Sequence, residues 1–373
     1  MVTSVSALGP VQASGVEAGT PASQLEFDEL ELAESVEAAN QAFLVDGAKS
    51  RSQTSIAAEA ARISPDAPAD LTTRRSISDL DQQTMAIAQR LAAGRGISVT
   101  DVNVRVKSVA SRRGLEVITL HIKRRLQDGQ YWEELVPYVA VEKPVAGAGL
   151  VPGQVVVADS EAVLSGEVSA NLLERAGLPN MLDDQVPLPV GPGSQDKDSS
   201  STTRPPSIRP EEIVGRALSA TDRGQVRDYA LRYALSPNNN YYLWSNDCTN
   251  FVSQALLAGG WSENLGFYQS DGNWWYTGSV LIRASYTWAG AENFYRFARV
   301  ESGRATRHAN VYDLRVGDIL QYKLTGAANM THTMVTTGHS AGVPLLSYHT
   351  TNTKNKPFTS ISSTGKTWFA SKV

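Results

Sequence analysis

The sequence of 373 residues predicts an α+β protein in which helices pack on antiparallel strands. Three observations carry this prediction. Apolar residues recur at helical spacing in 25–44, which favours an amphipathic helix. Apolar and polar residues alternate from Val102 to Val106, which is the period of a half-buried strand. Aromatic residues concentrate after the segment 187–210, so a second unit of different composition follows there.

The N-terminal part is expected to contain two helices and three strands. Residues 1–24 are small and polar and predict disorder. The expected helices are 25–44 and 77–91, and the expected strands lie at 102–106, 115–122 and 131–141. Turn residues separate the strands, so we expect an antiparallel meander packed on the preceding helix. This domain, 25–186, carries no constellation typical of a site, and His121 is interpreted as a structural strand residue.

The linker and the unit beyond it are predicted from composition. Residues 187–210 are rich in Pro, Gly, Ser and Thr, which predicts a flexible linker. Six of the seven tryptophans lie at or beyond Trp244, so 211–373 should form a distinct, aromatic-rich domain. Its first helix is expected at 223–235 and ends before Pro237.

Composition excludes several classes of protein. The formal net charge of −4 gives no indication of a nucleic-acid partner. No run of about 18 apolar residues exists, so no transmembrane helix is expected. The first 20 residues carry no basic residue and no sustained apolar core, unlike a signal peptide, which leaves either a non-exported protein or a removed leader.

Cys248 is the only cysteine, so it forms no internal disulfide and no thiolate zinc site. Apolar residues at 251, 252, 255 and 256 predict a helix that begins near Cys248, with Asp247 as N-cap and Gly259–Gly260 as the stop. The positive end of a helix dipole favours a thiolate, and the free N–H groups there can bind an oxyanion. A buried structural cysteine remains the alternative at this point.

The histidines of the same domain are the candidates for a base that activates Cys248. Two strands flank the turn 338–342, and a pairing sum of 681 places His332 opposite His349 on one sheet face. One histidine would then act as base and the other as its orienter. A slip of one residue would turn His349 to the other face and make Asn352 the alternative orienter. A metal site on the two histidines is the competing interpretation, disfavoured because no carboxylate lies nearby in sequence.

These residues together resemble the family called the putative amidase domain, a branch of the papain-like superfamily close to the NlpC/P60 peptidases. The resemblance covers about 212–373 and rests on six ordered segments: 229–234 (YALRYA), 247–254 (DCTNFVSQ) with 259–261 (GGW), 274–276 (WWY), 317–322 (GDILQY), 332–333 (HT) and 347–350 (SYHT) with Asn352. It implies a papain-like fold, with a cysteine-bearing helix packed on a small antiparallel sheet. It also implies a bacterial hydrolase, secreted or associated with the cell wall, that cleaves amide bonds of peptidoglycan peptides.

The resemblance assigns roles residue by residue. Cys248 matches the nucleophile, His332 the base and His349 the third position, to which Asn352 is a further candidate. Asp247 and Thr249 match residues that flank the nucleophile and help to bind substrate. No cofactor and no metal are implied, because the loop 323–331 lacks the acidic residues expected ahead of the histidine.

The remaining site residues follow from position in the sequence. Tyr242 and Asn246 are candidate oxyanion donors beside the N–H of Cys248. Trp244, Trp274 and Trp275 are candidates for the lining of a substrate groove, with core packing as the alternative.

The predicted activity is hydrolysis of an amide bond through an acyl-thioester on Cys248. Rival activities with the same chemistry are a transpeptidase, a deamidase and a toxin-like hydrolase of a protein. A rival of another class is a non-catalytic module that binds the cell wall or a partner protein. A nucleophile paired with histidine should react quickly with iodoacetamide near neutral pH, whereas an inert core thiol should not.

Overall fold

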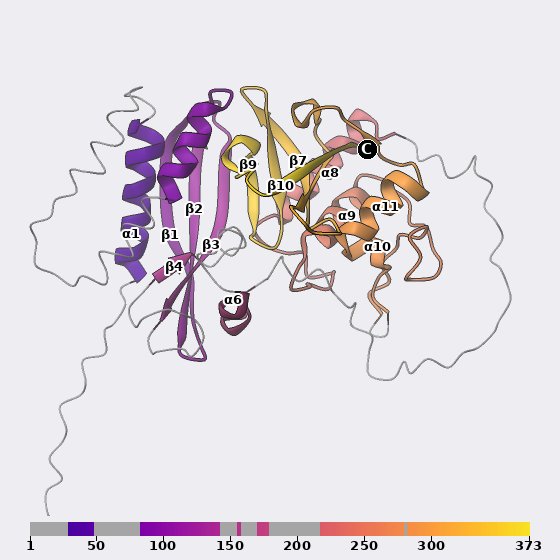
Figure 1. The fold of residues 1–373 in the computed structure, drawn as a ribbon, viewed down its shortest axis with the longest axis horizontal. Coiled ribbons are helices and arrows are strands. Elements are labelled where there is room, and N and C mark those ends of the chain that lie inside the picture. Colours follow the sequence, from indigo (N-terminus) through magenta and orange to yellow (C-terminus); the bar gives the residue numbers. More distant parts are fainter. Residues whose placement is uncertain (1–28, 48–82, 142–154, 158–169, 179–216, 280–281) are drawn as a thin grey trace, which may run out of the picture.

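The computed structural model describes residues 29–47, 83–141, 155–157, 170–178, 217–279 and 282–373. The predicted disordered segment 1–24 and the predicted linker 187–210 lie outside these residues. The described part is an α+β structure with helices packed on a large antiparallel sheet, which confirms the predicted class (Figure 1).

The N-terminal part is the predicted helix-and-meander unit. Helix α1 (Glu29–Asn40) continues as the π-helix η1 (Gln41–Asp46), and a second helix covers 83–93. The meander consists of β1 (Val99–Arg112), β2 (Leu115–Leu126) and β3 (Tyr131–Val141). Buried residues of both helices pack on these strands in one apolar core. The predicted packing of the meander on its preceding helix is thereby confirmed.

One sheet runs through both parts of the chain. Its strand order is β1-β2-β3-β9-β8-β7-β6-β10-β5, with β4 (Val155–Val157) also paired to β3. The join is the pairing of Glu133 and Glu134 of β3 with Lys354 and Thr353 of β9. The N-terminal meander thus extends the sheet of the cysteine-bearing part instead of lying apart from it (Figure 1).

The helices of the C-terminal part lie on one side of this sheet (Figure 1). They are α8 (Ala220–Tyr233), α9 (Cys248–Ala258), α10 (Tyr286–Ala289), α11 (Ala291–Arg296) and the π-helix η2 (Phe297–Glu301). Ser219 caps α8, because its Oγ accepts from the N–H of Asp222 while the Asp222 carboxylate accepts from the N–H of Ser219. The short helix α6 (Ala170–Ala176) contacts β2.

The C-terminal strands are short and mostly buried. They are β5 (Thr306–Arg307), β6 (Ile319–Leu324), β7 (His332–Ser340), β8 (Val343–Tyr348), β9 (Thr353–Pro357) and β10 (Lys366–Lys372), with the 3-10 turns η3 (Val311–Asp313) and η4 (Phe358–Ser360). A two-residue turn at Ala341 and Gly342 joins β7 to β8, and both residues have positive φ. Such a turn matches the twist of a hairpin and favours glycine.

Two apolar cores lie on opposite faces of this sheet. On one face α8 and α9 pack against a tryptophan-rich cluster that includes Trp274 and Trp288 and reaches Val335 of β7. On the other face Tyr322, Met334 and Tyr348 form a second cluster with the partly buried Trp368. Alternate residues of β7 therefore serve different cores, so neighbouring residues such as His332 and Thr333 face opposite sides of the sheet.

Candidate functional site at the start of helix α9

Cys248 is the first residue of α9, as predicted, and its side chain is buried. The sulfur lies 3.7 Å from Oγ1 of Thr249 and accepts the backbone N–H of Thr333 in β7. Burial raises the pKa of the Cys248 thiol; the Thr249 and Thr333 contacts oppose the rise, and the charge of Asp247 adds to it. The resting residue is therefore a thiol, held with its sulfur against the start of β7.

A chain of hydroxyl and amide groups fixes α9 on the sheet. Oγ1 of Thr249 and Oγ1 of Thr333 are 2.9 Å apart, and Nε2 of Gln321 donates to the same Thr333 oxygen at 3.1 Å. All three side chains are buried. Because unsatisfied buried hydroxyl groups are costly, this chain holds the first turn of α9 in one place relative to β6 and β7.

Asp247 occupies the N-cap position, but its carboxylate makes no capping hydrogen bond to the helix backbone. Oδ1 accepts from the N–H of Trp244 at 3.1 Å and from Nδ2 of Asn250 at 2.8 Å. Oδ2 faces Nδ1 of His349 at 2.7 Å. The side chain expected to cap the helix instead binds the histidine next to the cysteine.

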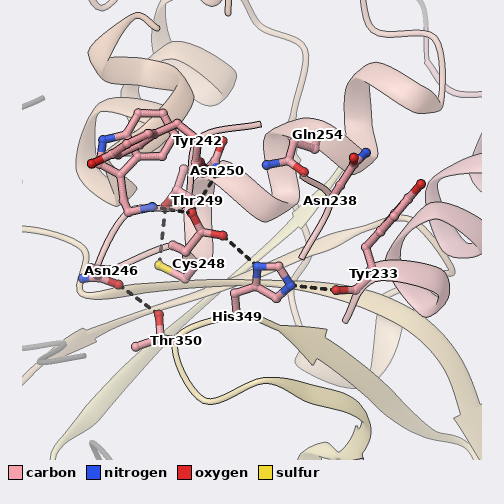
Figure 2. Close-up of polar contacts among 12 residues, drawn as sticks. Tyr233, Asn238, Tyr242, Asn246, Cys248, Thr249, Asn250, Gln254, His349 and Thr350 are labelled. Carbon is pink, nitrogen blue, oxygen red and sulfur yellow. Dashed lines mark hydrogen bonds and ion pairs between the residues drawn. The ribbon is translucent and has the colours of Figure 1, made fainter. Parts of the chain in front are cut away.

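His349 is held between two acceptors (Figure 2). Its Nδ1 faces the Asp247 carboxylate, and its Nε2 lies 2.8 Å from the carbonyl oxygen of Tyr233. Both hydrogen bonds form together when the ring carries two protons, since each acceptor then receives one N–H. Tyr233 ends α8, whose carbonyl end also favours a cation. The ring stacks on Phe251 with centroids 4.1 Å apart.

The predicted pairing of His332 with His349 is wrong. Val335 pairs with Ser347, and a bulge between Thr336 and Gly338 shifts the register closer to the turn. The pairing next to the histidines is thus displaced by one residue from the predicted register. Because side chains alternate across a sheet, this slip places His332 and His349 on opposite faces.

His332 lies in the second core, away from α9. It pairs with Tyr322 of β6, and its ring contacts the rings of Tyr322 and Tyr348 at 5.4 and 4.9 Å. Among the described residues neither ring nitrogen has a hydrogen-bond partner. Burial, with a smaller effect of Lys366, lowers the pKa of His332 to about 3. The structure therefore holds His332 neutral and does not bring it into the polar contacts of Cys248.

The other histidines have structural partners. His121 lies 2.9 Å from Glu133, as its interpretation as a structural residue requires. His308 lies 2.9 Å from the buried carboxylate of Asp318. His339 belongs to β7 and contacts the carbonyl of Leu314 at 2.7 Å.

The residues predicted to bind an oxyanion or to orient the base make other contacts in the structure. The N–H of Tyr242 donates to Oη of Tyr276, so it is not free to bind an oxyanion. Oδ1 of Asn246 accepts from Oγ1 of Thr350 at 3.0 Å, which ties the loop before Cys248 to the loop after His349. The carbonyl of Asn352 accepts from the N–H of Leu135 in β3. No described contact joins Asn352 to Cys248 or His349.

The three tryptophans differ in position. Trp274 is completely buried and donates to Oγ of Ser253, and Trp275 is 7% exposed and donates to the carbonyl of Gly266. Both belong to the interior, so the predicted groove lining is wrong for them. Trp244, three residues before Asp247, is also buried, but it packs edge-on against the exposed ring of Tyr242.

Two contributors to the site were missed from the sequence. Thr333 follows His332 directly and faces Cys248 where the histidine was expected; the alternation of a strand carried this signal, but its phase depended on the register. Tyr233 acts through its carbonyl oxygen, and the residue type does not reveal that role. Among the described residues no group of three or more His, Cys, Asp or Glu side chains could hold a metal ion. None of the described helices is long and apolar enough to cross a membrane.

The sequence that carries this site is similar to one protein family and to two proteins of Bacillus subtilis. A family model described as "Putative amidase domain" matches residues 220–371. "Uncharacterized protein YhbB" of Bacillus subtilis (strain 168) is 31% identical over 142 residues, which are 37% of this chain and 44% of that protein. "Uncharacterized protein YjcM" of the same organism is 27% identical over 176 residues, 44% of this chain and 39% of that protein. No solved structure matches.

The chain matches less than half the length of both relatives. The predicted resemblance to the amidase domain is confirmed over 220–371, the segment that carries Cys248, Asp247 and His349. The family description suggests hydrolysis of amide bonds. The relationship to the NlpC/P60 peptidases stays a prediction.

Proposed function

We propose that this protein is a cysteine-dependent amide hydrolase with Cys248 as nucleophile and the Asp247–His349 pair as its proton-transfer unit. The observation that carries the proposal is the buried pair at 2.7 Å directly beside the first turn of α9. A buried carboxylate–imidazole pair adjoining the only cysteine of the chain is an arrangement typical of functional sites. The cysteine-bearing helix on an antiparallel sheet supports a papain-like arrangement.

In each half of the reaction His349 passes on one proton and receives another. The sulfur of Cys248 bonds to the amide carbon, and the N–H at the start of α9 stabilises the oxyanion. His349 gives a proton to the leaving nitrogen as the C–N bond breaks, and the thiol proton restores the ring. Water then attacks the thioester and gives its proton to the sulfur by way of His349. The products are an amine and a carboxylic acid.

Both nitrogens of His349 are engaged in the resting structure, so proton transfer requires one of its bonds to open. The bond to the Tyr233 carbonyl holds Nε2–H, which leaves Nδ1 as the nitrogen on the side of Asp247. Asp247 therefore sets the orientation of the ring, and the expected third-position role passes from His349 to the Asp247 carboxylate. His332 has no role in this mechanism.

The proposed substrates are peptides of the bacterial cell wall, and the proposed location is outside the cytoplasm, secreted or bound to the wall. The ordered sequence segments shared with amidase-domain proteins support this substrate class, and relatives from a Bacillus species are in keeping with it. A transpeptidase would use the same acyl-enzyme and differ only in accepting an amine in place of water.

The test is digestion of purified peptidoglycan followed by mass spectrometry of the released peptides. Wild type and His332→Leu should release the same new amine and carboxylate ends, whereas Cys248→Ala and Asp247→Asn should release none or far fewer. Products that persist in Cys248→Ala would refute the proposal. Added glycine amide that appears in the products would reveal transpeptidation, and binding to peptidoglycan without cleavage would favour a wall-binding module.

A further inference from the structure

Three aromatic residues, Tyr242, Trp244 and Tyr276, lie beside the first turn of α9 and are called the aromatic rim. The N–H of Tyr242 donates to Oη of Tyr276 at 2.8 Å, and Nδ2 of Asn250 donates to the carbonyl of Tyr242 at 3.0 Å. The ring of Tyr242 packs edge-on against Trp244 with centroids 5.0 Å apart. Tyr242 and Leu243 nevertheless remain 37% and 54% exposed. Figure 2 shows Tyr242 and Asn250 grouped above the cysteine at this end of α9.

Arg283 lies on this rim. Its guanidinium carbon is 4.2 Å from the centroid of the Tyr242 ring. Its carbonyl accepts from the N–H of Thr277 at 2.8 Å and of Gly278 at 3.2 Å, so its backbone is fixed. Within the described part of the chain its buried Nε has no hydrogen-bond partner.

The acidic residues of this region are committed elsewhere. Asp247 binds His349, and Glu263 accepts the N–H of Tyr276 at 2.7 Å. Among the described residues no carboxylate forms an ion pair with Arg283. A guanidinium above an aromatic ring can still donate its N–H groups to a planar, two-oxygen acceptor, because the ring engages its charge and not its donors. A carboxylate is the acceptor that this fork binds best in a peptide.

We infer that Arg283 is a substrate-binding residue that recognises a carboxylate close to the amide bond that is cleaved. This rests on the proposed function, since it places the carboxylate on the peptide that Cys248 attacks. The carboxylate belongs either to an acidic side chain or to the free C-terminus of the peptide, and the fork binds both in the same way. The inference thus narrows the substrate class to acidic or short, free-ended peptides.

Binding and cleavage should be measured separately. The binding arm uses isothermal titration of Cys248→Ala with acetylated alanine tetrapeptides in which one position is glutamate or glutamine and the C-terminus is free or amidated. If Arg283 binds the carboxylate through two charge-assisted hydrogen bonds, the peptide with a carboxamide at that position should bind about ten- to a hundredfold more weakly than the peptide with the carboxylate. Comparison of the two series identifies which carboxylate is bound.

Arg283→Gln in the same background should abolish this discrimination, and Arg283→Lys should keep part of it because the charge remains without the fork. Arg299→Gln is the matched control, since Arg299 also stacks on a tyrosine, Tyr295, with a separation of 5.3 Å, but lies on η2. Circular dichroism of each variant verifies folding.

Equal affinity for carboxylate and carboxamide peptides, discrimination that survives in Arg283→Gln, or no measurable binding of any peptide would overturn the inference. The cleavage arm uses wild type with the same peptides. Selective binding without cleavage would refute the proposed hydrolase and leave the role of Arg283 standing; cleavage without selectivity would do the reverse.

Discussion

Glu133 joins the N-terminal meander to the sheet that carries the candidate site, and its replacement by glutamine tests that joint. Its carboxylate lies 2.9 Å from Nε2 of His121 and 3.0 Å from Nζ of Lys354 in β9. The hydrogen bond with His121 and the charge of Lys354 outweigh burial and lower the pKa of Glu133 from 4.5 to about 2.

The difference between these pKa values corresponds to about 3 kcal/mol of stability. Because the folded value lies below the unfolded one, this stability is present in full above about pH 4.5 and is lost as the pH falls towards 2. At pH 7 the free energy of unfolding of Glu133→Gln should be lower than that of wild type by about 1–3 kcal/mol, since the amide oxygen still accepts one hydrogen bond.

Urea unfolding followed by tryptophan fluorescence at pH 7 and pH 3 measures this difference. Trp132 precedes Glu133 in β3 and reports on the same strand. The gap between wild type and variant should shrink at pH 3, and Glu301→Gln, at an exposed position, should show no gap at either pH. A gap that is absent at pH 7, or that stays constant with pH, would refute the assigned role of the Glu133 contacts.

Three further predictions concern the site itself. Asp247→Asn should lower kcat for peptide cleavage about 10²- to 10⁴-fold with intact circular dichroism, because the amide lacks the charge of the carboxylate that faces Nδ1 of His349; an unchanged kcat would remove Asp247 from the mechanism. Burial and the raised pKa of Cys248 predict slow iodoacetamide labelling at pH 7 that accelerates above pH 9, measured by mass spectrometry. Because the resting thiol is buried whether or not it is a nucleophile, its labelling rate does not separate a nucleophile from an inert thiol, and the Cys248→Ala digestion is the deciding test. His332→Leu should be more stable than wild type at pH 4 by up to about 3 kcal/mol in urea unfolding, because folded His332 stays neutral down to pH of about 3 while the unfolded residue binds a proton below about 6.5; a less stable variant at pH 4 would contradict its neutral, unpartnered state.

The elements that the sequence predicts well are those fixed by local patterns. The alternation in β1 to β3 and the helical spacing after Cys248 each depend on neighbouring residues, and both are found in the structure. The turn predicted at 338–342 is found in shorter form, at Ala341 and Gly342, because 338–340 belong to β7. The α+β class follows from them. Cys248 at the first turn of α9 follows as well, because apolar residues at 251, 252, 255 and 256 set the phase of the helix.

The features that the sequence missed depend on longer-range geometry. The bulge in β7 changes the register by one residue and exchanges the faces of His332 and Thr333. Gly338, at the bulge, is the available signal, because a glycine inside a strand often marks one, but it is interpreted from the sequence as the start of the turn. The Asp247 side chain binds His349 instead of capping α9, and this contact depends on the position at which β8 ends. The pairing of β3 with β9 joins segments that composition alone had separated.

The join between β3 and β9 also constrains the order in which the protein folds. Glu134 and Thr353, which pair across it, are more than 200 residues apart in the chain. During synthesis the part of the β3 edge that pairs with β9 stays unpaired until β9 has left the ribosome, since chains fold from the N-terminus as they emerge. Contacts this distant in sequence slow folding, and an unpaired strand edge invites pairing with other chains. Misassembly during expression should therefore involve the part of the β3 edge at Glu133 and Glu134, which stays unpaired until β9 is made.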